Sequence, residues 1–104
     1  MIKIVAKAVV KEEMIEEFHK AAAPLVEASA AEEGNISYSL NQNVNDKCRH
    51  AFIEIWKDQD AIEKHNASEH FTGILPKLAQ MCDGELDIEL YKEVRVYKKP
   101  CCNV

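Results

Sequence analysis

Two histidines in the second half of the chain could perform acid–base chemistry. His65 lies seven residues after Asp58, near the end of an expected short helix, and His70 lies near the start of the next helix. A neutral imidazole can remove a proton near neutral pH, which is the step that activates a phenol or hydroquinone. His65, and after it His70, are therefore candidate catalytic bases. As a catalytic base, His65 would be partly exposed. In the structural alternative, His65 would bond a backbone carbonyl and hold the loop between the two helices, and His70 would form a hydrogen bond beside Phe71.

A carboxylate lies between two aromatic side chains on one face of an expected strand. Phe52, Glu54 and Trp56 alternate along the sequence and therefore share a face. Aromatic residues at this spacing either bind substrate or fill the core. A charge on a covered face needs a partner. We expect Glu54 to be a structural charge paired with Lys3 or Lys7, with a role as general base as the alternative.

Tyr38 and Phe71 complete the candidate site. Tyr38 lies between Ser37 and Ser39 in an alternating run, and its hydroxyl could reach a pocket or cap the core. Phe71 directly follows His70. The expected substrate-binding residues share aromatic character: Tyr38, Phe52, Trp56 and Phe71.

The elements that would position these residues follow from changes in hydrophobic period. Residues 2–10 alternate as a strand, and from residue 11 apolar positions recur every three or four residues, which predicts a helix containing Pro24 and ending at 32–34 with Gly34 left-handed. Residues 36–40 and 50–56 form a predicted hairpin, 58–66 and 68–81 two helices, and 86–97 a last strand. This order is β-α-β-β-α-β, an α+β ferredoxin-like fold.

Composition limits the classes of protein that fit. The 104 residues suffice for one domain, which we place at 1–97 with a tail at 98–104. A net charge of -5 argues against nucleic acid as a partner, and no stretch is long enough to cross a membrane. The N-terminal residues lack the features of a signal peptide, so we expect a cytoplasmic protein.

The four cysteines show no metal-ligand spacing. We expect free thiols in a reducing compartment and neither a metal nor a cofactor. The adjacent Cys101 and Cys102 could bind a soft metal or oxidise, or form an inert tail.

The expected fold leaves one face of the sheet without helices. Val5 and Val9 make this face of the first strand partly apolar. Large apolar patches are seldom left open to water, so we expect a homodimer formed through sheet faces.

Four motifs in this order resemble the antibiotic-biosynthesis-monooxygenase family: Gly34-x-x-x-Tyr38-x-Leu40, Phe52-x-Glu54-x-Trp56, Ala61-x-x-x-His65 and Ser68-x-His70-Phe71. The resemblance covers about residues 1–94. It implies a dimeric α/β barrel whose subunits each enclose a pocket between helices and sheet. It also implies activities that include cofactor-independent quinol monooxygenation, haem degradation and sugar-phosphate isomerisation. The haem-degrading branch is disfavoured, because Leu75 stands where that branch needs an axial histidine.

The function that we expect is therefore a cofactor-independent monooxygenase that uses O2 on a small quinol-like or phenolic substrate. Two alternatives remain open at this point. One is an isomerase or lyase of a small carbonyl compound that uses the same base, and the other is a non-catalytic dimeric ligand-binding module.

Overall fold

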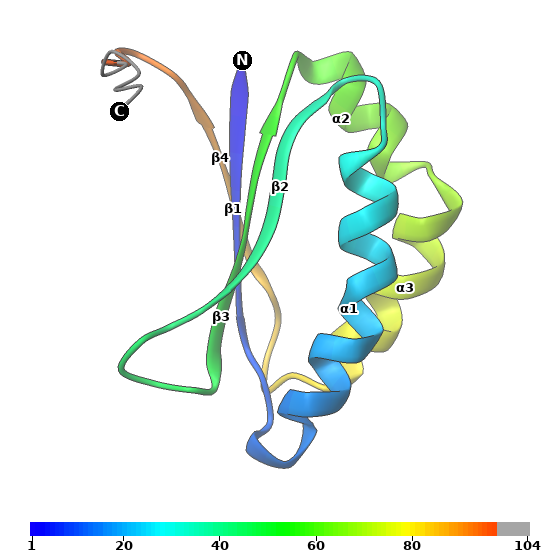
Figure 1. Ribbon diagram of the computed structural model, residues 1–104, viewed down its shortest axis with the longest axis vertical. Helices are drawn as coiled ribbons and strands as arrows, with labels where there is room; N and C mark the ends of the chain where they lie inside the picture. The colour runs from blue at the N-terminus through cyan, green and yellow to red at the C-terminus, as the bar shows by residue number, and fades with distance from the viewer. Residues whose placement is uncertain (98–104) are drawn as a thin grey trace, which may run out of the picture.

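The computed structural model describes residues 1–97 and shows a four-stranded antiparallel sheet with its helices on one face (Figure 1). The strands are β1 (Ile2–Val9), β2 (Asn35–Gln42), β3 (Arg49–Trp56) and β4 (Asp87–Lys92), in the spatial order β2-β3-β1-β4. The helices are the 3-10 turn η1 (Glu12–Met14), α1 (Ile15–Ala30), α2 (Gln59–Asn66) and α3 (Glu69–Gln80). The predicted α+β ferredoxin-like fold is confirmed. The predicted tail and its Cys101-Cys102 pair lie outside the described residues.

The core lies between the helices and the central strands. Alternate residues of β1 and β3 point toward the helices because successive side chains of a strand face opposite sides. The residues that form this core are all buried and apolar: Ala6, Ala8, Val10, Phe18, Ala22, Leu25, Phe52, Leu78 and Cys82. No helix of residues 1–97 is long and apolar enough to span a membrane.

Helix caps fix the short helices that carry the two histidines. Asp58 Oδ1 accepts a hydrogen bond from the Ala61 backbone N–H at 2.9 Å, and Ser68 Oγ accepts one from the Phe71 backbone N–H at 3.3 Å. Both are N-cap contacts of the kind that Asp and Ser side chains favour at the start of a helix. Each contact also sets where its helix begins.

The long helix ends earlier than the sequence pattern predicts. It starts as a 3-10 turn and α1 ends at Ala30, so Glu32 lies outside it. The left-handed conformation expected at Gly34 is wrong, because Gly84 is the residue with positive φ among residues 1–97. Gly34 is needed for space instead: a Cβ there would overlap the Cβ of Ala61 at the start of α2.

The last strand is shorter than predicted. β4 covers Asp87–Lys92, and residues 93–97 are not in a strand. Its partner β1 begins at Ile2, which pairs with Lys92, so β4 ends level with the start of β1.

Candidate active site

A small pocket lies between the sheet and the two short helices. Its volume is about 210 Å³. The lining residues come from all four strands, α2, α3 and their flanking turns: Ile4, Ala6, Tyr38, Phe52, Glu54, Gln59, Ile62, His65, Asn66, Phe71, Leu75, Leu86, Ile88 and Leu90. Leu90 and Ile88 are each 49% exposed although they face the helix side of the sheet. The open side of the pocket therefore lies along β4.

His65 is the most enclosed polar group of the pocket. Its residue is 1% exposed, so the expectation of a partly exposed imidazole is wrong. The ring lies among aromatic side chains, with centroids 4.5 Å from Trp56, 4.9 Å from Phe71 and 5.7 Å from Tyr38. Burial lowers the pKa of His65, and the hydrogen bond with Glu32 only partly opposes this shift. The imidazole is thus held in its neutral form near neutral pH.

Glu32 joins the two histidines. Its Oε2 lies 2.6 Å from His65 Nδ1 and 2.8 Å from His70 Nε2. The carboxylate can only accept, so each ring nitrogen facing it carries a proton. This leaves Nε2 of His65 without a proton when the ring is neutral. The structural alternative for His65, a bond to a backbone carbonyl, is replaced by this carboxylate contact.

The same three residues are the group among residues 1–97 that could hold a metal ion, with ligand atoms within 4.8 Å of one another. Ligands of a tetrahedral zinc ion bonded at about 2.0–2.1 Å would stand about 3.3 Å apart. The spacings of 2.6 and 2.8 Å are those of charge-assisted hydrogen bonds. The distances between Glu32 and the two histidines therefore match hydrogen bonds better than coordination of one metal ion.

Glu54 faces the pocket and has no cationic partner among residues 1–97. The predicted pairing with Lys3 or Lys7 is wrong, because Glu54 stands opposite Ile4 on the helix side of the sheet while both lysines point to the other side. Its Oε1 accepts a hydrogen bond from the Trp56 indole N–H at 2.9 Å. Burial raises the pKa of Glu54 to about 7.

Some of the other predicted site residues line the pocket, and the rest lie outside its lining. Tyr38, Phe52 and Phe71 line the pocket, and burial raises the pKa of Tyr38, so its hydroxyl stays protonated. Trp56 is fully buried in a second apolar cluster and does not line the pocket. His70 contacts Glu32 outside the lining.

Glu32 is the residue that sequence reasoning missed. It was counted as the end of a helix in a glutamate-rich chain, and no spacing distinguished it from its neighbour Glu33. A carboxylate partner could have been expected from the two histidines themselves. Nothing in the sequence says which carboxylate it is.

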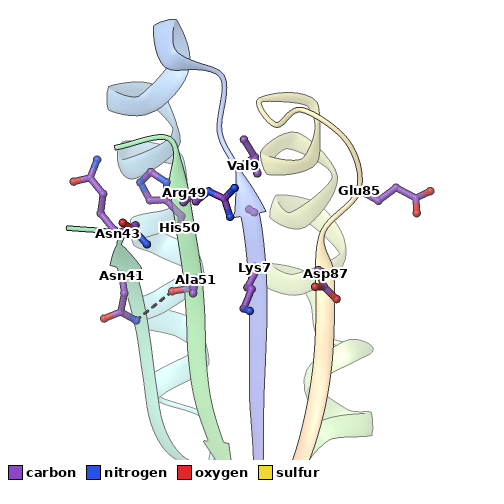
Figure 2. Close-up of a pocket in the computed structure, with 11 residues that line it drawn as sticks. Lys7, Val9, Asn41, Asn43, Arg49, His50, Ala51, Glu85 and Asp87 are labelled. Atoms are coloured by element: carbon purple, nitrogen blue, oxygen red, sulfur yellow. Dashed lines mark hydrogen bonds between the residues drawn. The ribbon is translucent and has the colours of Figure 1, made fainter. Parts of the chain in front are cut away.

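A second, wider hollow lies on the open face of the sheet. Figure 2 shows Lys7, Arg49 and Asp87 around it, on three different strands. Its volume is about 390 Å³. It contains neither His65 nor Glu54, so it is separate from the candidate active site.

The protein is thus a small α+β protein with a ferredoxin-like sheet, and its pocket contains a carboxylate–histidine pair that is suited to acid–base chemistry. Residues 1–76 match the family described as antibiotic biosynthesis monooxygenase. A Bacillus subtilis protein named "Putative monooxygenase YcnE" is 39% identical over 88 residues, covering 85% of this chain and 93% of that protein. The chain belongs to the antibiotic biosynthesis monooxygenase family.

Solved structures agree with this assignment. A conserved protein from Methanosarcina mazei Go1 is similar, with a TM-score of 0.87 and 35% identity, over 88% of this chain and 91% of that one. A structure described as antibiotic biosynthesis monooxygenase has a TM-score of 0.87 and 29% identity, over 91% of this chain and 100% of that one. The family resemblance seen in the sequence is confirmed.

Proposed function

We propose that this protein is a cofactor-independent monooxygenase that acts with O2 on a small quinol-like or phenolic substrate. The observation that carries the proposal is the hydrogen bond between Glu32 and Nδ1 of His65. It fixes the ring so that Nε2 is the nitrogen free to take a proton. Family membership and the name of the Bacillus relative favour the same class of reaction.

The pocket suits a one-ring substrate. An apolar cavity of about 150 Å³ can hold benzene. The volume of about 210 Å³ here leaves room for a substituted ring. Phe52 and Phe71 supply apolar walls, and Tyr38 supplies a hydroxyl that remains a hydrogen-bond donor.

The chemistry closes without a bound cofactor. His65 removes a hydroxyl proton, and the resulting electron-rich anion reduces O2. One oxygen atom becomes bonded to a ring carbon and the other leaves as water. The two electrons needed for O–O cleavage come from the substrate, so that a hydroquinone becomes a hydroxyquinone. The protein contributes orientation and a dry site, in which a neutral imidazole is the base.

Oxygen uptake with a panel of hydroquinones and phenols tests the proposal. We expect His65→Ala to lower turnover at least 100-fold, in line with the usual contribution of a general base of about 10² to 10⁴. His19→Ala is the matched control, since His19 is exposed on α1 and does not line the pocket. A wild-type rate equal to the buffer rate with every substrate would overturn the proposal.

The same base would also serve an isomerase or lyase, because the His65–Glu32 pair needs no oxygen to transfer a proton. Turnover of a small carbonyl compound under strictly anaerobic conditions would favour that function. A non-catalytic binding module instead predicts that His65→Ala leaves ligand affinity nearly unchanged, whereas Leu75→Trp, which fills the pocket, abolishes it.

We also propose a homodimer formed through the open sheet faces. This face carries apolar side chains that no helix of residues 1–97 covers, among them Val9 and Ile53 at 42% and 38% exposure. It also carries both signs of charge around the hollow of Figure 2, which is lined by Lys7, Arg49 and Asp87. Such a face is complementary to a second copy of itself.

A further inference from the structure

Glu54 occupies an unusual position for a carboxylate. It lies in the middle of β3, opposite Ile4 of β1 and Tyr38 of β2, and its residue is 6% exposed. It forms no ion pair within residues 1–97. A buried carboxylate without a cation costs stability, which gives reason to look for a use of this group in the pocket.

The two oxygen atoms of Glu54 have different surroundings. Oε1 is held by the Trp56 indole N–H at 2.9 Å. The other oxygen receives no hydrogen bond from the part of the chain that the structure describes, and it is not sealed inside the protein. The open space that it meets is the pocket that His65 also lines. One oxygen is thus anchored and the other is available to a ligand.

Burial acts in opposite senses on these two groups. It raises the pKa of Glu54 to about 7 and lowers the pKa of His65. Near neutral pH a large fraction of Glu54 carries a proton while His65 does not. A pair shifted in this way can divide the roles of acid and base.

We propose that Glu54 is a second catalytic residue of the pocket, a general acid that protonates the oxygen leaving from a substrate hydroperoxide. The proposal rests on the function proposed above and extends it to a dihydroxyaromatic substrate. After O2 has added to a ring carbon, the peroxide anion takes the proton held by His65. In the next step the O–O bond and the ring C–H bond break and a C=O bond forms.

The protons balance in this step. The ring proton goes to His65, and the Glu54 proton goes to the departing hydroxide, which leaves as water. His65 then loses one proton to solvent and Glu54 gains one, which restores the starting state. Without the acid, the hydroperoxide has another exit: it eliminates H2O2 and leaves the unhydroxylated quinone, a reaction that also balances.

Simultaneous measurement of oxygen uptake and H2O2 tests the proposal, with hydroquinone as the probe. Glu54→Gln keeps the side-chain shape and an oxygen for the Trp56 N–H but cannot supply the proton. We expect turnover to fall about 100-fold, within the usual range for general acid catalysis. We also expect the remaining oxygen uptake to appear largely as H2O2, seen as oxygen returned on addition of catalase.

Trp56→Phe provides a second readout in case the glutamine variant folds poorly. The Trp56 hydrogen bond lowers the pKa of Glu54, so its loss should raise that pKa and move the alkaline limb of the turnover profile to higher pH. If Glu54 had only a structural role, Trp56→Phe would leave the alkaline limb in place and Glu54→Gln would leave the share of oxygen released as H2O2 unchanged.

The outcomes separate the two proposals. If wild-type protein turns over hydroquinone and Glu54→Gln matches it in rate and in water formation, the acid role is overturned and the monooxygenase function stands. If wild-type protein consumes no oxygen with any hydroquinone or phenol, both are overturned.

Discussion

Glu32 Oε2 lies 2.6 Å from Nδ1 of His65, although 33 residues separate the two in the chain. The carboxylate belongs to the turn between α1 and β2, and the imidazole belongs to the last turn of α2. Gly34 allows this approach, because its missing side chain lets the start of α2 lie against the chain two residues after Glu32. The pair is therefore built by the packing of a turn on a short helix.

Loss of the Glu32 carboxylate should impair His65 without removing it. We expect Glu32→Gln to lower turnover by about 10- to 100-fold, less than His65→Ala, because the ring loses its fixed orientation. Glu32 raises the pKa of His65, so the variant should have a lower His65 pKa and an acid limb displaced to lower pH. The pH dependence of kcat/KM measures both effects. Glu33→Gln, an exposed neighbour, is the control and should behave as wild type.

Glu54 should make the protein less stable as pH rises. Its pKa is about 7 in the folded protein against 4.5 as the ordinary value, so the folded state binds more protons between these limits. The stabilisation from protonated Glu54 is fully present below pH 4.5 and is lost as pH rises through about 7. The free energy of unfolding falls by about 3 kcal/mol at most over this range.

The Glu54→Gln variant isolates this contribution from that of His65, which also titrates. Urea unfolding at pH 5 and pH 8 should show a smaller loss of stability for the variant than for wild type. The exposed control Glu63→Gln should keep the wild-type difference. Equal pH dependence in wild type and Glu54→Gln would contradict the raised pKa.

A side chain at Gly34 should be costly. Gly34→Ala would place a Cβ on that of Ala61, and overpacking of this kind costs about 1–3 kcal/mol. Gly73→Ala in α3 is the matched control, since a Cβ there meets nothing within 4 Å. Replacement of a helical glycine by alanine raises the free energy of unfolding by about 0.5–1 kcal/mol. Thermal unfolding of the two variants should shift in opposite directions, and a neutral Gly34→Ala would show that the contact relaxes freely.

The open sheet face should hold two subunits together. Sedimentation at micromolar concentration should give a species of twice 11.8 kDa for wild type. A charge at the centre of the face, Ile53→Arg, should yield monomer because an unpaired charge would be buried. Val44→Arg, in an exposed loop, should leave the dimer intact. A wild-type monomer would contradict the proposed assembly.

The fold was readable from the sequence because its signals are local. The alternation over residues 2–10, the caps at Asp58 and Ser68 and the turn at Gly84 each act within a few residues. The end of α1 was less predictable, since residues 31–34 continue a helix-like composition while the chain must turn to enter β2.

The candidate site was predicted only in part because its partners meet through tertiary structure. The shared face of Phe52 and Glu54 follows from strand alternation, whereas their approach to Tyr38 on the neighbouring strand depends on the register of β2 and β3. The contact of Glu32 with His65 depends on how the turn packs on α2, which no spacing encodes. The error over Lys3 and Lys7 arose from the parity of β1 relative to β3, which the register of the sheet decides.

Trp56 is the sole tryptophan of the chain, and its indole is bonded to Glu54 while its ring lies 4.5 Å from that of His65. The protein therefore carries a single tryptophan, in contact with both titrating groups of the pocket. Its emission should report the protonation of either group, and the arrival of a ring in the pocket, without any added label.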